Sequence, residues 1–152
     1  MLPKLVRIEG PIHQEYAFKR LNKAMNLSPA PASFHKAYWT TIEEMTQKGR
    51  FERRGDFLWP KGITTIKVRV ALNGAEAEVR PIEYISSEEI GTTMLHVLTH
   101  SIGISQGSLI QETANFFRAR LTPKTKQMLE TELSMLLSSN KITRAGEILS
   151  IT

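Results

Sequence analysis

The chain repeats itself at a separation of about 92 residues, so any fold assigned to it has to contain two copies of one plan. In the first part of each copy the separation is 92 residues, which pairs Ile12 with Ile104, residues 17–18 with 109–110 and residues 24–25 with 116–117. In the second part it is 91, which pairs Tyr38, Ile42 and Met45 with Leu129, Leu133 and Leu136. One residue is therefore gained or lost in the turn between the two parts.

The two copies carry the same helix signals in the same order. A helix is predicted over residues 13–25 and again over residues 105–117, because apolar residues recur there at helical spacing. A turn that contains proline follows in both copies. A second helix is predicted over residues 33–48 and 122–139, with one apolar stripe on each. Each copy therefore contains a pair of helices joined by a turn.

A β-hairpin is predicted after the second helix of each copy. Gly49 and Asn140 suit the left-handed conformation that ends a helix. The short alternating segments that follow have Gly55 and Gly146 at their tips, which is typical of a hairpin. In the first hairpin we expect Phe57 to face inward, with Leu58 or Trp59 facing outward.

A further helix is predicted before each pair. Residues 86–89, Ser-Ser-Glu-Glu, are typical of a helix N-terminus, and an apolar stripe then runs up to His100. The counterpart over residues 2–8 is short and contains Pro3, so we expect the chain to begin inside that helix. Three helices and a hairpin form the plan of a winged helix-turn-helix, whose third helix is the candidate reader of nucleic acid.

We therefore predict an α+β, mostly helical fold with two winged helix-turn-helix units in tandem, each of three helices and a β-hairpin. The first unit is placed at residues 1–62 and the second at residues 86–152, with an ordered extended linker at residues 63–85 between them. In that linker, residues 63–70 have strand composition, Asn73-Gly74 is a turn signal, and residues 78–85 are predicted to be extended. The alternative for the same pattern is a single mixed domain around a central sheet.

Composition and charge narrow the classes of function. The chain has no cysteine, which removes disulfides and thiolate chemistry and favours a reducing compartment, and no segment has the apolar length of a membrane span. We expect a cytoplasmic protein without a membrane partner. Residues 1–81 carry 14 Lys and Arg against 8 Asp and Glu, a charge of +6, whereas residues 82–152 carry 6 against 7, a charge of −1. Only the first unit is suited electrostatically to a nucleic acid.

The candidate nucleic-acid-binding residues lie on the second predicted helix of the first copy and on its hairpin. They are His35, Lys36, Trp39, Lys48, Arg50, Arg53 and Arg54. The outward face of that helix also carries Glu43 and Glu44 and lacks the Arg or Asn that reads guanine or adenine, which favours recognition of backbone or shape over bases. Trp39 is the better candidate for stacking on bases, since we expect Trp59 to pack against the linker.

No catalytic residue, cofactor or metal site is predicted. The serines lack a nucleophile elbow, and the glycines lack the continuation of a phosphate loop. His96 and His100 have a spacing that places two imidazoles on one metal, but no third ligand is evident nearby, so a structural role is favoured.

The chain also resembles a known family over nearly its whole length. The resemblance rests on Glu-Gly-Pro-Ile-His at residues 9–13, Arg-Arg-Gly-Asp-Phe-Leu-Trp-Pro at 53–60, Arg-Pro-Ile-Glu at 80–83, Glu-Glu-Ile at 88–90 and Gly-Ile-Ser at 103–105. These look like an uncharacterised family of C-terminal domains in large bacterial proteins related to superfamily I DNA helicases. The resemblance implies a nucleic-acid-processing parent whose ATPase and nuclease modules lie elsewhere.

Partners are predicted from these features together. DNA, as duplex or junction, is expected to bind the first unit, and other domains of a larger helicase-like chain are expected to contact the second. A homodimer is a further expectation, because the stripe Ile90, Met94, Val97 and Leu98, with Leu137 and Ile151, offers more apolar surface than a small unit buries. The alternative function is a protein-interaction scaffold that does not contact DNA.

Overall fold

The structure, a computed structural model, describes residues 1–69 and 79–152. It is α+β and mostly helical, and it divides into two compact units, Met1–Thr65 and Ile66–Thr152. In this division residues 66–69 and 79–85 of the predicted linker belong to the second unit. Within the described ranges, no helix combines the length and the apolar character that a bilayer-spanning segment needs.

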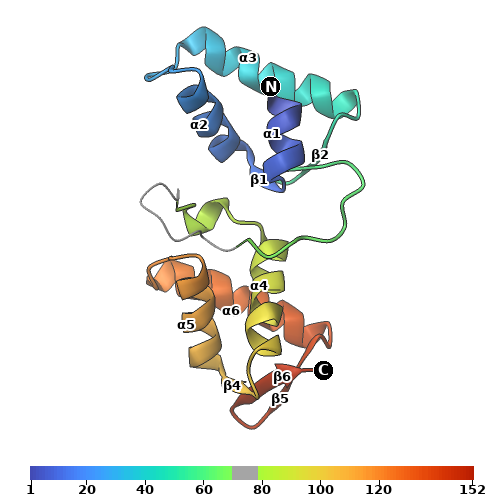
Figure 1. Cartoon of the computed structure of the whole chain (residues 1–152), viewed down its shortest axis with the longest axis vertical. Helices are drawn as coiled ribbons and strands as arrows, with labels where there is room; N and C mark the ends of the chain where they lie inside the picture. Colours follow the sequence, from blue (N-terminus) through green and yellow to red (C-terminus); the bar gives the residue numbers. More distant parts are fainter. Residues whose placement is uncertain (70–78) are drawn as a thin grey trace. The chain divides into compact units, whose positions relative to one another are not determined.

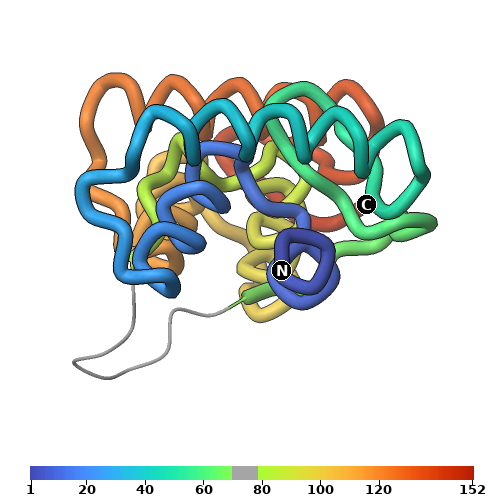
Figure 2. Tube along the Cα trace, turned by 90° about the horizontal axis from the view of Figure 1, so that it is seen from above, coloured from blue at the N-terminus to red at the C-terminus, as the bar shows by residue number. Residues whose placement is uncertain are grey.

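The first unit contains three helices and a small antiparallel sheet (Figure 1). In chain order its elements are α1 (Leu2–Glu9), β1 (Ile12–His13), α2 (Gln14–Ala24), α3 (Ala32–Gln47), β2 (Glu52–Arg54) and β3 (Phe57–Trp59). The sheet order is β1-β3-β2, so the hairpin of β2 and β3 is completed by the short strand before α2. Figure 2 shows α1 nearly end on while α3 runs across the view, so these two helices cross steeply.

The second unit repeats this order. Its elements are α4 (Ser87–Thr99), β4 (Ile104–Ser105), α5 (Gln106–Phe116), α6 (Pro123–Ser138), β5 (Ile142–Ala145) and β6 (Ile148–Ile151), and its sheet order is β4-β6-β5. Strands β1 and β4 begin 92 residues apart, and so do helices α2 and α5. Helices α3 and α6 begin 91 residues apart, as the sequence predicts. The predicted repeat, with its change of separation in the middle turn, is therefore confirmed.

Local signals explain where the elements end. Gly49 and Asn140 have positive φ angles of 65° and 57°, as expected of residues that end a helix. Gly55 and Gly146, with φ of 58° and 62°, lie at the tips of the two hairpins, and no other atom comes near the place where a Cβ would be. The residues predicted to end a helix and to form the tip of a hairpin therefore have the expected conformations in both units.

One prediction about the first hairpin is wrong. Leu58 and Trp59, not Phe57, are the buried residues of β3, and Leu58 pairs across the sheet with Ile12 and Arg53. Phe57 is half-buried and meets the ring of His13 edge-on, with ring centroids 5.1 Å apart. The predicted alternation is absent, because Leu58 and Trp59 point to opposite faces of this central strand and both faces are covered.

The apolar stripe on α4 is core and not an exposed patch. Ile90, Met94 and Leu98 are at most 3% exposed and pack with the other buried residues of the second unit, and Val97 packs against the same cluster. Of the residues from which the homodimer was predicted, Ile151 is substantially exposed, at 43%. The expected exposure of the α4 stripe is therefore wrong, because three helices and a sheet already enclose it, whereas the homodimer itself stays a prediction.

The linker differs from the extended hairpin that its composition predicts. Residues 63–69 form neither helix nor strand, and Ile82–Tyr84 form a single 3₁₀ turn. Val70, the Asn73-Gly74 turn signal and Glu78 lie outside the described residues. A strand needs a neighbour to accept its backbone hydrogen bonds, and the described part of the linker is instead held by the side chains of Arg69 and Arg80, which donate to Glu89.

A buried carboxyl group between α4 and α6 makes the stability of the second unit depend on pH. The Ser87 hydroxyl donates a hydrogen bond to Glu132, which is 7% exposed, and a Cβ at Gly91 would lie 2.6 Å from the Glu132 Oε1 atom. Burial raises the pKa of Glu132, with a smaller contribution from the negative charge of Glu88. An added Cβ at position 91 would therefore require the Glu132 carboxyl group to move.

We expect Glu132→Gln to raise the midpoint of thermal unfolding at pH 7 by a few degrees. The folded state holds the Glu132 proton more tightly than the unfolded state, so its ionisation costs stability as pH rises through the raised pKa. The gain should shrink as pH falls towards the ordinary pKa of a glutamic acid. Circular dichroism melts at several pH values measure this, and a constant difference at all of them would contradict the assignment.

Candidate nucleic-acid interface

Helix α3 presents the face that its apolar spacing predicts. Tyr38 and Ile42 are buried, whereas His35, Lys36, Thr40, Glu43, Glu44 and Gln47 are exposed. The Tyr38 hydroxyl donates a 2.6 Å hydrogen bond to the carbonyl oxygen of Gln14, the first residue of α2, and burial raises the pKa of Tyr38. This contact joins the buried face of α3 to the first residue of α2.

His35 and Trp39 form a pair one turn apart on α3. The Trp39 indole N–H donates to Nδ1 of His35 at 3.3 Å, and the His35 ring lies against Phe18 with ring centroids 4.3 Å apart. Trp39 is half-buried, with its ring edge-on to Tyr38 at 5.1 Å. Because Nδ1 of His35 accepts this bond, a neutral His35 carries its proton on Nε2. The pair offers one partly open aromatic face and one imidazole edge.

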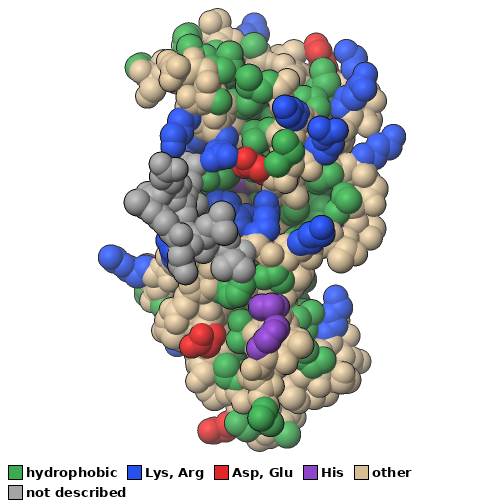
Figure 3. All heavy atoms as spheres, viewed as in Figure 1, with side chains coloured by type: hydrophobic (Ala, Val, Ile, Leu, Met, Phe, Trp, Pro, Cys, Tyr) green, Lys and Arg blue, Asp and Glu red, His purple; other side chains and the backbone are tan. Residues whose placement is uncertain are grey.

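Cationic side chains surround the C-terminal end of α3 and the hairpin. Lys48 is the C-cap residue of α3, and Arg50 and Arg53 follow it; all three are exposed. Arg53 lies on the edge strand β2, where it pairs with Leu58. Figure 3, in which Lys and Arg are blue, shows basic side chains spread over the first unit. Three of the predicted hairpin cations are therefore accessible to a polyanion.

Arg54 also makes contacts within the first unit. Its guanidinium donates to Glu52 Oε2 at 2.7 Å and to the Ile63 carbonyl oxygen at 3.3 Å, and lies 4.2 Å from the centroid of the Trp59 ring. The hydrogen bond from Arg54, and that from the Gly62 backbone N–H, lower the pKa of Glu52. Trp59 is buried, and its predicted packing against the linker stays a prediction. Arg54 therefore links the segment after the hairpin to the sheet.

Sequence reasoning missed Lys61 as a member of this surface. A hollow of about 330 Å³ lies between the end of α3 and β2, and it is lined by Thr46, Gly49, Phe51, Glu52, Arg53 and Lys61. Lys61 is exposed and follows the Trp-Pro pair that ends the hairpin. Its position shortly after β3 was the available signal, because a residue next to the end of a hairpin strand lies near the partner strand.

The second unit carries little of this surface. At a separation of 91, Lys48 and Arg54 correspond to Ser139 and Ala145. Arg50 and Arg53 correspond to Lys141 and Arg144, and Arg144 donates to the Gln106 side chain at 2.5 Å. The fold is thus repeated, but the cationic hairpin is not.

His96 of α4 and the C-cap residue His100 do not form a larger cluster in the described part of the chain. The rings of His96 and His100 are 4.4 Å apart, His96 meets Phe116 edge-on, and Nδ1 of His100 is 2.8 Å from the His96 carbonyl oxygen. Across residues 1–69 and 79–152 no group of three or more His, Cys, Asp or Glu is placed to hold a metal ion. Aromatic and backbone contacts account for this pair.

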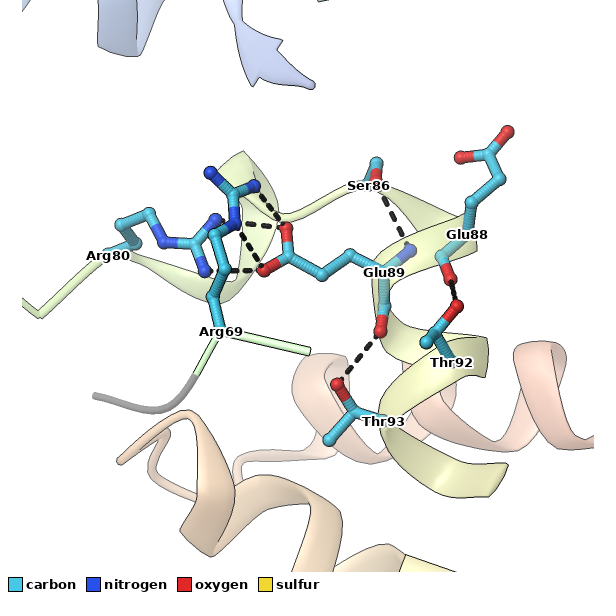
Figure 4. Close-up of polar contacts among 7 residues, drawn as sticks. All are labelled: Arg69, Arg80, Ser86, Glu88, Glu89, Thr92 and Thr93. Carbon is cyan, nitrogen blue, oxygen red and sulfur yellow. Dashed lines mark hydrogen bonds and ion pairs between the residues drawn. The ribbon is translucent and has the colours of Figure 1, made fainter. Parts of the chain in front are cut away.

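A cluster around Glu89 was also missed from sequence. Arg69 and Arg80 both donate to the Glu89 carboxylate, with shortest distances of 2.7 and 2.6 Å, and Glu89 is fully buried (Figure 4). Burial alone would raise the pKa of Glu89, but the hydrogen bonds from Arg80 and Arg69 outweigh it and lower the pKa. Ser86 accepts the Glu89 backbone N–H and caps α4, which leaves the carboxylate for the two arginines. The cluster fastens both described ends of the linker to α4.

Comparison with known proteins adds no family assignment. No protein-family model matches the chain, and neither the curated proteins nor the solved structures include a significant match to it. The resemblance to helicase-associated domains therefore stays a prediction from the sequence motifs.

Proposed function

We propose that the chain is a pair of winged helix-turn-helix units that serves as a non-catalytic, nucleic-acid-binding module of a larger helicase-like protein. The order of three helices and a hairpin in each unit, with the third strand before the second helix, supports the fold assignment. The sequence resemblance supports the parent protein. The proposed role requires no catalytic residue in this chain.

The observation that carries the proposal is the set of exposed cations on the first unit. Lys48, Arg50 and Arg53 project from the end of α3 and the hairpin, next to the exposed helix face that begins with His35 and Lys36. Phosphate contacts from such side chains provide affinity without sequence information. Glu43 and Glu44 on the same helix disfavour close approach to bases, so we assign recognition of backbone or duplex shape.

The proposal predicts the salt dependence of DNA binding. Replacing Lys48, Arg50 and Arg53 together with Ala should reduce the slope of log affinity against log salt by roughly 2.7, since each lost phosphate contact contributes about 0.9. Affinity should fall for duplexes of unrelated sequence alike. Fluorescence anisotropy titrations with duplex, forked and single-stranded DNA at several salt concentrations measure both quantities.

A matched control removes the same charge from the second unit. Lys124, Lys126 and Lys141 are exposed, and replacing them with Ala should leave the slope nearly unchanged. Equal effects of the two triple variants would move the site away from the hairpin. Binding that does not respond to salt would contradict the nucleic-acid assignment and favour the protein-interaction scaffold.

A further inference from the structure

The first unit has a groove between α1 and α2 that the proposed DNA contacts do not use. A hollow of about 410 Å³ has an apolar floor made by Met1, Leu5, Ile8, Leu21 and Ala24. A second hollow of about 200 Å³ shares Met1 and Leu21 with it and extends the apolar surface towards Met25 and α3. None of the residues that line the larger hollow belongs to α3 or to the hairpin.

The apolar side chains of this groove are unusually exposed. Ile8 is 66% exposed and Met25 46%, although large apolar side chains of a small unit are normally covered. Helix α1 buries Leu2 and Val6 on its other side, so it carries apolar stripes on two faces and its own unit covers one. The outer stripe is therefore available to another apolar surface.

The rim of the groove is cationic. Lys4 lines it from α1, and Arg20 and Lys23 line it from α2, whereas no Asp or Glu is among the described residues that line the hollow. Arg20 is held by Glu9 at 2.5 Å, so Lys4 and Lys23, both exposed, are the charges that a ligand meets first. Two helices of 8 and 11 residues form the walls, a length that fits about two to three turns of a third helix.

We infer that this groove binds an amphipathic helix of a partner protein, with the apolar face of that helix on Leu5, Ile8 and Leu21 and acidic residues beside Lys4 and Lys23. Apolar anchors at helical spacing that lie in a groove between two helices are a common mode of peptide recognition. The cationic rim selects acidic partners. This site is separate from the hairpin cations and does not depend on the proposed DNA contact.

The test uses the full chain and a designed probe. The probe is a synthetic helical peptide of about 16 residues with Leu along one face and Glu elsewhere, and its control has the same composition in scrambled order. Amide signals of α1 and α2 in a heteronuclear NMR titration should shift saturably with the probe and not with the scrambled peptide. Absence of saturable binding, or shifts confined to α3 and the hairpin, would overturn the inference.

Two single variants locate the contact. Ile8→Glu should weaken probe binding by at least about tenfold, because it places a carboxylate on the apolar floor opposite an acidic ligand. Ile63→Glu is the matched control, since Ile63 is 40% exposed in the same unit and does not line the groove, and it should leave affinity unchanged. Equal affinities of the wild type and Ile8→Glu would exclude this groove.

The remaining measurements separate other occupants. The DNA affinity of Ile8→Glu should equal that of the wild type. A failure of the groove to bind the probe can therefore be distinguished from a failure of the proposed DNA binding. Vesicles of phosphatidylserine and phosphatidylcholine that compete fully with the probe would assign the groove to a membrane surface and overturn the inference. Concentration-dependent dimerisation that Ile8→Glu abolishes would assign it to a second copy of the chain and also overturn it.

Discussion

Replacing Glu89 with Gln should lower the free energy of unfolding of the second unit by about 3 kcal/mol. The Glu89 carboxylate is fully buried, and it is the shared acceptor for Arg69 and Arg80, which are 30% and 19% exposed. The neutral Gln amide leaves the two guanidinium groups without a negative partner. Its NH₂ group also places a hydrogen-bond donor against the N–H donors of the arginines. The partial exposure of the arginines lets them turn towards water, which keeps the cost at the low end for a buried ion pair.

The positions of the tryptophans allow this effect to be assigned to one unit. Trp39 and Trp59 are the two tryptophans of the chain, and both belong to the first unit. In urea titrations, far-UV circular dichroism should therefore report the loss of stability, while tryptophan fluorescence follows the first unit. Glu88→Gln is the control, because Glu88 is the exposed neighbour whose carboxylate points away from the arginines (Figure 4). Equal losses in the two variants would contradict the role of the cluster.

The same variant should remove an acid-sensitive part of the stability. The pKa of Glu89 is lower in the folded state than in the unfolded chain, so its contribution is complete above the ordinary pKa of a glutamic acid. It is lost as pH falls through the lowered folded value. Glu132 has the opposite sign, because its raised pKa makes stability fall as pH rises. Acid titrations of Glu89→Gln should lack the loss at low pH and keep the Glu132 dependence.

The repeated fold could be predicted from the sequence because the signals behind it are local or repeated. Helix spacing, the glycines at hairpin tips and the residues that end helices all act within a few positions, and each occurs twice at a separation of 91 or 92 residues. The exposed face of α3 followed from the same spacing. Two copies of one weak pattern constrain a prediction more than either copy alone.

The Glu89 cluster could not be predicted in the same way. The pattern from Ser86 to Glu89 indicated a helix start correctly, but it did not indicate that the Glu89 carboxylate bonds to Arg69 and Arg80, which are 20 and 9 residues away. One signal was available, since Glu89 lies on the buried side of α4 with Thr93, a position where a charge needs a partner. The strand composition of residues 63–70 pointed instead to a hairpin.

Arg54 shows what the strand register adds to an assignment by composition. Among the hairpin arginines it was grouped with Arg50 and Arg53 as a phosphate ligand. In the observed register Glu52 pairs with Trp59 and Arg54 with Phe57, so Arg54, Glu52 and Trp59 share one face of the sheet. An arginine beside a carboxylate and an indole on one face is engaged within the protein, whereas Arg53 points to the other face.

Gly10→Ala should destabilise the first unit by about 3 kcal/mol, the upper part of the range for overpacking. The backbone of Gly10, with φ of −70° and ψ of 150°, is one that any residue adopts, so conformational freedom is not the reason. A Cβ at this position would lie 2.4 Å from the Val6 carbonyl oxygen and 2.5 Å from Cδ of Pro60. The end of α1 and the residue after β3 approach each other closely enough to require glycine between them.

This contact joins two of the motifs on which the family resemblance rests, residues 9–13 and 53–60. Tryptophan fluorescence should record the loss in urea, because Trp59 is buried next to Pro60. Gly107→Ala is the control: Gly107 lies in α5, no atom lies within 4 Å of its added Cβ, and helix propensity predicts a gain of up to about 1 kcal/mol. An unchanged fluorescence midpoint for Gly10→Ala would show that the end of α1 moves without cost.

A double-mutant cycle with Pro60→Ala separates the two contacts of the added methyl group. Removing the proline ring takes away the atoms at 2.5 and 2.9 Å, Cδ and Cγ, but leaves the Val6 carbonyl oxygen in place. If both contacts contribute, Gly10→Ala should cost less in the Pro60→Ala background than in the wild type, and a residual cost should remain. Equal costs in the two backgrounds would assign the whole effect to the backbone of α1, since the ring would then be able to move aside.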